Sequence, residues 1–241
     1  MFTGIVQGIA TVAGIIDAGG VRTIDIRLPD DVAKGLRRGD SLAVNGVCLT
    51  LARPAAGDTV TCDLILKSLS VTNLIDLRIG EPVNVERAAK QNAEIGGHLL
   101  SGHIDFTAIV VDVEEIDANK VLRLSIPQRH RRYFFQKGYI ATEGCSLTIA
   151  ECNKIDGLIE LWLIPETRRS TTLDVKLAGD RVNVEVDRQT QVLVDTLRET
   201  VLEIVGHDDA KVPDLVADSL IRRRAITSPA QLIGRSTIDN G

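Results

Sequence analysis

Two short segments carry the side chains that are best suited to chemistry. They are Cys48-Leu49-Thr50 and Ser146-Leu147-Thr148, and each has one thiol or hydroxyl group on either side of a leucine. Such groups can add to an electrophilic carbon or pass on protons when a base assists them. For Cys48 taken alone, the alternative is a small buried core residue. For Thr50 or Thr148 taken alone, it is an ordinary strand threonine. The same arrangement at two places in one chain favours a site in each.

The two segments belong to a repeat that extends over most of the chain. A shift of 98 positions aligns Gly4 with Gly102, and a shift of 99 aligns Val83-Asn84-Val85-Glu86 with Val182-Asn183-Val184-Glu185. A period this long is the size of a small domain, not of a solenoid unit. We therefore expect two copies of one fold, each with one copy of any site. Two similar sites suit a protein that handles two molecules of the same ligand.

Composition describes an ordinary globular protein. The chain has 241 residues, 44% of them hydrophobic and 25% charged, with a net charge of −5 that gives no reason to expect nucleic acid as a partner. It contains neither a run of about 20 apolar residues nor a basic, then apolar N-terminal leader. We expect a cytoplasmic protein with no membrane partner.

The four cysteines form no CxxC pair, and the histidines do not cluster with them at ligand spacing. Reduced thiols and the absence of a metal site are therefore expected. We expect Cys62 and Cys145 to be core residues.

Short segments with alternating apolar residues occur at matching places in both copies. Ile24, Ile26 and Leu28 alternate with polar residues, as do the corresponding residues of the second copy, Leu122, Leu124 and Ile126. Period-two patterns of this length predict half-buried strands. Short helical segments over residues 30–36 and 128–135 are expected after a proline in each copy. We favour a small antiparallel barrel in each copy, because closure removes exposed strand edges.

The pattern changes after Asp187, which is a suitable N-cap residue. Val194, Leu197, Val201 and Ile204 recur at spacings of three, four and three, which predicts an amphipathic helix over residues 188–206. The pattern leaves two roles open, packing on its own barrel or forming an oligomer. We expect residues 207–241 to form a poorly ordered tail.

Seven ordered motifs resemble the riboflavin synthase alpha-chain family and its lumazine-binding repeat. They are Met1-Phe2-Thr3-Gly4-Ile5-Val6, Asn45-Gly46-Val47-Cys48-Leu49-Thr50, Gly96-Gly97-His98-Leu99-Leu100-Ser101-Gly102-His103, Lys137-Gly138, Ser146-Leu147-Thr148, Leu163-Ile164-Pro165-Glu166-Thr167 and Val182-Asn183-Val184-Glu185-Val186-Asp187. The resemblance implies an all-β protein with two homologous six-stranded Greek-key β-barrels and a C-terminal α-helix. The expected domains are an N-terminal lumazine-binding barrel over 1–97, a C-terminal one over 98–187, the oligomerisation helix and the tail.

The resemblance also implies an activity. The family members are transferases that dismutate two molecules of 6,7-dimethyl-8-ribityllumazine into riboflavin and 5-amino-6-ribitylaminouracil, the last step of riboflavin biosynthesis. It implies no cofactor, a homotrimer, and association with lumazine synthase. A non-catalytic lumazine- or flavin-binding antenna protein and a structural protein built on duplicated barrels are the alternatives.

Site residues follow from matching the motifs position by position. Our hypothesis for the reactive set is Cys48, Ser146, Thr148 and His103. The substrate-binding residues are, in the first copy, Gly4, Ile5, Val6, Cys48, Leu49, Thr50, Asp63, Leu64, Ile65, Leu66, Lys67 and Ser68, and in the second copy, Gly102, His103, Ile104, Lys137, Ser146, Leu147, Thr148, Trp162, Leu163, Ile164, Pro165, Glu166 and Thr167.

Three residues differ from the family pattern. Lys67 stands where a glutamate is usual, Glu143 where an aspartate is usual, and Tyr139 where a smaller or apolar residue is common. We expect His98 to have a structural role. Glu86 and Glu185 are expected to be turn or surface carboxylates.

Overall fold

The computed structural model describes residues 1–53 and 55–205, with only the backbone at Leu66, Lys67 and Val205. The expected helix end at Gly206, the tail over 207–241 and the Lys67 side chain lie outside this description. None of the described helices combines the length and the apolar character needed to span a membrane.

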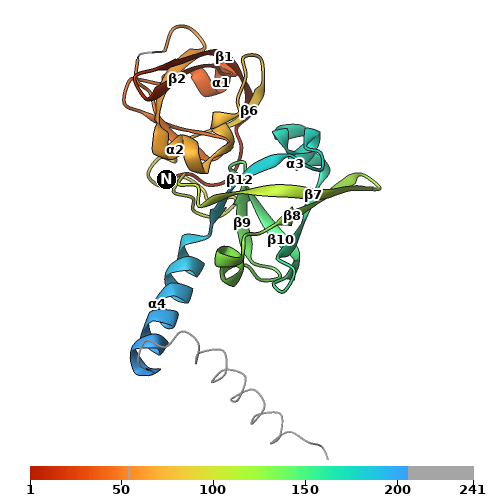
Figure 1. Ribbon diagram of the computed structural model, residues 1–241. Helices are drawn as coiled ribbons and strands as arrows, with labels where there is room; N and C mark the ends of the chain where they lie inside the picture. Colours follow the sequence, from red (N-terminus) through yellow and green to blue (C-terminus); the bar gives the residue numbers. More distant parts are fainter. Residues whose placement is uncertain (54, 206–241) are drawn as a thin grey trace, which may run out of the picture. The chain divides into compact units, whose positions relative to one another are not determined.

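The first copy is a six-stranded antiparallel sheet (Figure 1). Its strands are β1 (Gly8–Ala18), β2 (Val21–Arg27), β3 (Ser41–Val44), β4 (Val47–Thr50), β5 (Thr59–Ile65) and β6 (Pro82–Arg87), and their order is β4-β3-β6-β1-β2-β5. Helices α1 (Asp30–Ala33) and α2 (Leu66–Val71) and the 3₁₀ turn η1 (Asn73–Ile75) lie in the connections. The return of β6 to lie beside β3 is the long connection of a Greek key.

The second copy repeats this topology as a closed barrel. Its strands are β7 (Phe106–Ile116), β8 (Asn119–Ser125), β9 (Tyr139–Thr142), β10 (Cys145–Asn153), β11 (Leu158–Leu163) and β12 (Arg181–Val186), in the order β10-β11-β8-β7-β12-β9. The connections hold η2 (Gln128–Tyr133), α3 (Pro165–Ser170) and η3 (Thr172–Val175). The helical segments after the two prolines are shorter than expected, and the one over Gln128–Tyr133 is 3₁₀.

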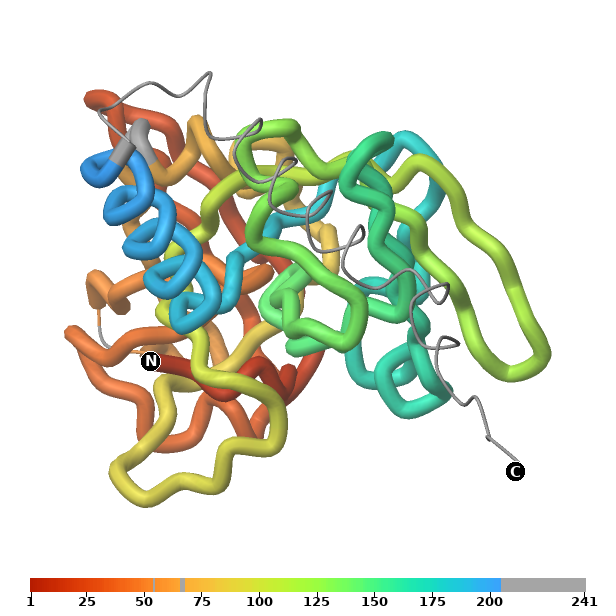
Figure 2. Tube along the Cα trace, turned by 90° about the horizontal axis from the view of Figure 1, so that it is seen from below, coloured from red at the N-terminus to blue at the C-terminus, as the bar shows by residue number. Residues whose placement is uncertain are grey.

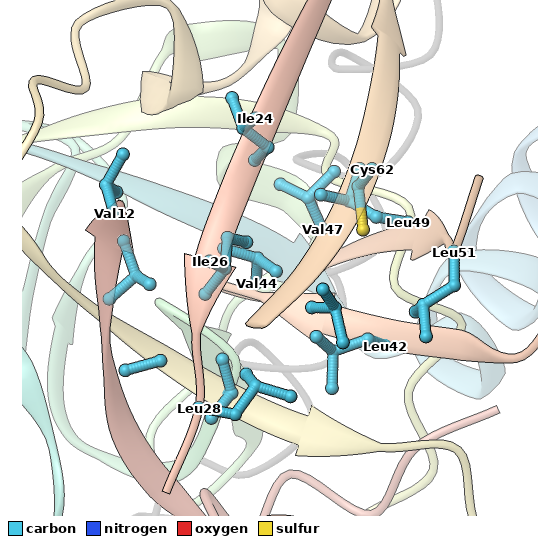
Figure 3. Packing of buried hydrophobic residues seen from close by; sticks show 14 of the residues in the cluster. Val12, Ile24, Ile26, Leu28, Leu42, Val44, Val47, Leu49, Leu51 and Cys62 are labelled. Carbon is cyan, nitrogen blue, oxygen red and sulfur yellow. The ribbon is translucent and has the colours of Figure 1, made fainter. Parts of the chain in front are cut away.

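Each copy surrounds its own apolar core, and the alternation expected from the sequence is confirmed. Figure 3 shows Ile24, Ile26 and Leu28 of β2 and the segment after it converging with side chains from β3, β4 and β5. All three are at most 3% exposed. Their counterparts Leu122, Leu124 and Ile126 are buried to the same degree in the second copy. Closely packed interiors of this kind fix the positions of the outward-facing residues between them.

The first copy departs from the expected closed barrel at one seam. β4 has four residues and meets β5 only through an isolated bridge between Leu51 and Cys62. The equivalent β10 has nine residues and pairs with β11 from Ile149 onward. The sequence places Pro54 shortly after β4, and proline has no N–H to donate to a continuing ladder. This explains why the first seam stays short.

A buried polar cluster joins the two copies through reciprocal hydrogen bonds. Asn84 Nδ2 donates to the Glu143 carbonyl, and its counterpart Asn183 donates to the Asn45 carbonyl, both at 2.9 Å. Asn183 Oδ1 accepts from Asn73 N–H and Asn84 Oδ1 from Thr172 N–H, both at 2.7 Å. We call these six residues the asparagine clamp. Each copy thus satisfies buried backbone groups of the other.

Turn glycines meet beside the clamp. A Cβ on Gly46 would lie 2.7 Å from the Gly144 nitrogen, and a Cβ on Gly144 would lie 2.8 Å from the Gly46 nitrogen. Only glycine permits this approach, and both residues have the positive φ that favours it. The repeat alignment around Cys48 and Ser146 is therefore matched by the arrangement of the two turns.

The last described helix is α4 (Arg188–Val205), close to the expected bounds. Asp187 Oδ2 accepts from the N–H of Thr190 at 3.0 Å, which confirms the N-cap. Leu197, Val201 and Ile204 are exposed apolar side chains of α4.

Candidate functional site

The two matching segments present their polar side chains outward, as expected. Leu49 and Leu147 are buried in the cores, at 5% and 7% exposure. Cys48 and Ser146 are half-buried and the threonines that follow them, Thr50 and Thr148, are exposed. The alternation of a β-strand therefore puts one thiol or hydroxyl and one threonine on the same outer face of β4 and of β10.

The segment before the first strand of each copy, which holds Gly4 in the first copy and Gly102 in the second, lies against the other copy. We call these the leading segments. Cys48 donates its backbone N–H to the Gly102 carbonyl at 2.8 Å, and Ser146 donates to the Gly4 carbonyl at 2.8 Å. Phe2 pairs with Leu100, so the N-terminal residues run beside the segment that enters the second copy (Figure 2). Each of the two candidate sites therefore combines residues from both halves of the sequence.

Glycine is required where each leading segment crosses the strand of the other copy. A Cβ on Gly4 would lie 2.5 Å from the Ser146 Cβ, and a Cβ on Gly102 would lie 2.5 Å from the Cys48 Cβ. Both glycines also have positive φ angles, of 75° and 77°. Any side chain would push the leading segment away from the reactive group.

Each crossing leaves a short open edge on the strand beside it. In the second copy Gly4 lies opposite Ser146, and pairing with β11 resumes only at Ile149. Alternate residues of an antiparallel strand direct their N–H and C=O groups to the same edge. Thr148 therefore directs its backbone N–H into the gap, and Thr50 does the same between Gly102 and the bridge from Leu51. Such gaps offer a donor to the edge of a planar ligand.

Buried carboxylates hold the leading segments in place. Glu86 accepts from Thr3 N–H at 2.6 Å and from Gly4 N–H at 3.1 Å. Glu185 accepts in the same way from Ser101 N–H and from Gly102 N–H, at 2.7 and 2.9 Å. The expectation that these are turn or surface carboxylates is wrong, since they are 3% and 1% exposed. Burial raises the pKa of Glu86, while the bonds from Thr3 and Gly4 oppose that shift.

His98, not His103, lies beside Ser146. The His98 Nδ1 and Ser146 Oγ atoms are 2.6 Å apart, and the imidazole stacks on Tyr139 with ring centroids 5.1 Å apart. The ring is 7% exposed and its Nε2 has no partner among the described residues. Desolvation lowers the pKa of His98, with Asp187 opposing the shift. A neutral imidazole in contact with a hydroxyl is a serine–base pair.

The sequence interpretation missed this pair because His98 has no counterpart in the first copy, since the shift that aligns Gly4 with Gly102 places His98 before Met1. Its place directly after Gly96-Gly97 was the available signal, since two glycines allow a chain to pass close to another segment.

His103 lies on the Gly102 segment, next to Cys48. Its side chain is exposed, its N–H contacts Ser101 Oγ at 3.3 Å, and its carbonyl accepts from Arg188 at 2.7 Å. The first copy has Ile5 at the matching position, 48% exposed beside Gly4. The two pockets therefore differ in the polar groups that they carry.

The remaining expected site residues follow the outward face of the neighbouring strands. Asp63 and Ile65 of β5 are exposed, Leu64 is buried, and Asp63 accepts from Thr23 Oγ1 at 2.7 Å. Ser68 lies on α2, which begins at Leu66 and includes Lys67. Val6 and Ile104 are half-buried, and Ile104 packs against the first core.

In the second copy Trp162 is 41% exposed and donates its Nε1–H to Glu160 at 2.7 Å, while Leu163 is buried. Ile164 is exposed and precedes α3, which starts with Pro165. Glu166 pairs with Arg169, and Thr167 accepts from Thr171. Lys137 is exposed at a turn with φ of 66°.

No group of three or more potential ligands that could hold a metal ion occurs among the residues described.

The comparison with known proteins agrees with this geometry. The sequence pattern described as the lumazine binding domain matches residues 3–88 and again residues 101–187. The riboflavin synthase of Escherichia coli (strain K12) is 44% identical over 198 residues, which cover 82% of this chain and 92% of that protein. The chain belongs to the riboflavin synthase family. Members of this family are transferases.

Two further relatives show how widely the likeness extends. The riboflavin synthase of Chlamydia pneumoniae is 36% identical over 86% of this chain and 100% of its own length. The crystal structure of LumP complexed with 6,7-dimethyl-8-(1'-D-ribityl) lumazine has a TM-score of 0.70 at 27% identity, over 77% of this chain and 99% of LumP. LumP has also been crystallised with riboflavin, and that structure has a TM-score of 0.72.

Proposed function

We propose that this riboflavin synthase family member converts two molecules of 6,7-dimethyl-8-ribityllumazine into riboflavin and 5-amino-6-ribitylaminouracil. The observation that carries the proposal is the pair of equivalent sites at Cys48 and at Ser146, each with a thiol or hydroxyl beside a strand N–H that is directed into a gap in the pairing. One lumazine gives a four-carbon unit to the other. The atoms of the two substrates equal those of the two products, so the reaction requires no oxidant and no additional carbon donor.

Each pocket suits a flat heterocycle with amide-like edges. The backbone N–H of Thr50 or Thr148 bonds the ring edge. The residues beyond it contact the ring face and the ribityl chain; these are the exposed Ile65 and the half-buried Ser68 in one copy, and the exposed Trp162 and Ile164 in the other. LumP supports this use of the fold, since its structure is described as a complex with the same lumazine. Residues 1–97 and 98–187 supply one pocket each, with the leading segments exchanged.

Ser146 and His98 carry out the addition step at one lumazine. The neutral imidazole accepts the hydroxyl proton as Ser146 Oγ attacks C7 of the ring, and returns it when that bond breaks. Cys48 and His103 serve the other lumazine, whose 7-methyl proton is acidic because the carbanion is delocalised over the ring. Thr50 and Thr148 orient the two substrates. Holding two reactants in this way can contribute about 7–11 kcal/mol to lowering a barrier.

The two rings must meet face to face, and a homotrimer provides this contact. The first pocket of one subunit faces the second pocket of its neighbour, a heterologous contact that closes into a ring. The exposed apolar residues of α4, among them Leu197 and Val201, support a helix that packs against its symmetry mates. The protein acts in the cytoplasm, where it associates with lumazine synthase, which makes its substrate.

Turnover of purified full-length protein tests the proposal. Mixing it with 6,7-dimethyl-8-ribityllumazine should produce riboflavin fluorescence, and Ser146→Ala should lower kcat by about 10²-fold or more. An inactive wild-type protein that binds the lumazine tightly would instead support an antenna protein like LumP. The higher identity to the synthases, 44% against 27%, favours the enzyme.

The oligomer is tested separately by sedimentation. The full chain should sediment as a trimer, and a chain ending at Asp187 should be monomeric and inactive. A truncated chain that remains trimeric and active would contradict the role assigned to α4.

A further inference from the structure

The first residue of α4 makes an unusual set of contacts with the segment that carries His103. The Arg188 guanidinium donates to the His103 carbonyl at 2.7 Å and to Asp105 Oδ1 at 3.0 Å. Its Nε lies 3.5 Å from Ser101 Oγ and 3.9 Å from the buried carboxylate of Glu185. One planar guanidinium thus contacts Ser101, which precedes Gly102, and His103 and Asp105, which follow it.

Asp105 anchors this arrangement to the barrel. Its Oδ2 accepts from Val186 N–H at 2.8 Å, and its own N–H donates to Val184 on β12. The Asp105 side chain is 12% exposed and that of Arg188 is 35% exposed. Since a partly buried, charge-assisted bond is stronger than a neutral one, Arg188 holds the segment firmly against β12.

The segment held in this way lies beside Cys48. Gly102 lies directly against Cys48, whose N–H it binds, and His103 follows it. The position of the His103 carbonyl fixes the backbone from which the imidazole projects. A displacement of this backbone would move the imidazole relative to Cys48.

The residue that matches Arg188 in the first copy is an alanine, which cannot make this contact. The repeat places Ala89 opposite Arg188, Ile5 opposite His103 and Gln7 opposite Asp105. A cavity of about 640 Å³ is lined by Thr3, Ile5, Gln7 and Ala89 among others. Only the histidine-bearing segment is therefore held by a guanidinium, although both segments are held by a glutamate.

We propose that Arg188 is a positioning residue that holds His103 in the orientation needed for proton transfer at the Cys48 pocket. This inference rests on the role assigned to His103 in the proposed function. Arg188 itself does not touch the substrate. Its presence in one copy only gives the two otherwise similar pockets different degrees of preorganisation, as the different roles of the two lumazines require.

The test is a double-mutant cycle on full-length protein, with 6,7-dimethyl-8-ribityllumazine as substrate. Arg188→Ala should lower kcat by roughly tenfold to a hundredfold, since a displacement of the order of 1 Å has effects of this size. KM should change by less than about twofold, because the contact acts on the transition state and not on substrate binding. In a His103→Gln background the same substitution should change kcat by less than about twofold.

Arg22→Ala is the matched control. Arg22 also binds one carboxylate, Asp17, and two backbone carbonyls, those of Leu74 and Ile75, but outside the pockets. Its loss should leave kcat unchanged. Arg188→Lys keeps a cation at the start of α4 but has one nitrogen in place of a planar fork, so it should restore kcat only in part.

Separate outcomes overturn the separate claims. An undiminished kcat in Arg188→Ala, or an equal loss in the presence and absence of His103, would overturn the positioning role. If His103→Gln alone retains wild-type kcat, the error lies in the proposed role of His103, and inactive wild-type protein would overturn the proposed function itself. If Arg188→Ala alters sedimentation or thermal stability, Arg188→Lys takes its place in the double-mutant cycle. The loss of kcat is then compared in the presence and absence of His103 as before.

Discussion

The asparagine clamp makes a quantitative prediction about stability. Replacing Asn183 with alanine removes the donor to the Asn45 carbonyl and the acceptor for Asn73 N–H, two contacts of 2.9 and 2.7 Å. Asn183 is fully buried, so water cannot take its place without rearrangement. Each buried group left unpaired costs about 1–3 kcal/mol. We expect Asn183→Ala to lower the free energy of unfolding by about 3–5 kcal/mol, a large share of the ~5–15 kcal/mol typical of a folded protein.

Urea denaturation followed by circular dichroism measures this loss, at one fixed protein concentration because an oligomer's stability depends on it. Asn84→Ala should cost a similar amount, since Asn84 makes the reciprocal bonds to the Glu143 carbonyl and Thr172 N–H. Asn153→Ala is the control, because Asn153 also bonds two backbone N–H groups, those of Ile155 and Asp156, but at an exposed turn where water can replace it, so its loss should cost less than Asn183→Ala, about 1 kcal/mol. A loss below about 1 kcal/mol for Asn183→Ala would refute the clamp as a major contributor to stability.

Three further predictions concern titratable groups. Burial lowers the pKa of His98, so the acid limb of the kcat profile should lie below the ordinary histidine pKa of about 6.5 and disappear in His98→Gln; a retained limb would assign it elsewhere. Burial raises the pKa of Cys62 and of Cys145 to about 12. Iodoacetamide at pH 8 should therefore label only the other two thiols, which mass spectrometry measures. Rapid labelling of all four cysteines in native protein would contradict the burial. Burial also raises the pKa of Glu143, with Lys176 opposing the shift. The native state then binds this proton more tightly than the unfolded state, so the free energy of unfolding should fall as pH rises above about 4.5, and should fall less in Glu143→Gln. Urea midpoints that change with pH in the same way in both proteins would contradict this.

The strands and their faces could be predicted because the information is local. Leu49 and Leu147 point into the cores and their neighbours point outward, as the period-two pattern requires. The difference in closure between the two copies could not be predicted from the motifs around Cys48 and Ser146, and its signal in the sequence, Pro54, lies outside them. It depends on whether β4 extends far enough to pair with β5, and the matching motifs around Cys48 and Ser146 do not encode the length of that pairing.

The site could be predicted only in part. The repeat identifies Cys48 and Ser146 as equivalent, and the structure gives them equivalent backbone partners, Gly102 and Gly4. The histidine that meets Ser146 could not be identified from spacing, because His98 lies 48 residues away and reaches Ser146 through the path of the connecting segment. Glu86 and Glu185 were misassigned for a similar reason, since the groups that they bind are more than 80 residues distant.

The sequence by itself determined the duplication, the inward and outward faces of the strands and, through its motifs, the family and its chemistry. These properties depend on residue type and short-range periodicity, which a linear chain displays directly. Only the tertiary structure decided that each leading segment crosses to the other copy, that His98 meets Ser146 and that Arg188 holds His103. Such contacts arise when two folded units pack around a shared polar cluster, and their geometry depends on distances in space that no pattern along the chain records.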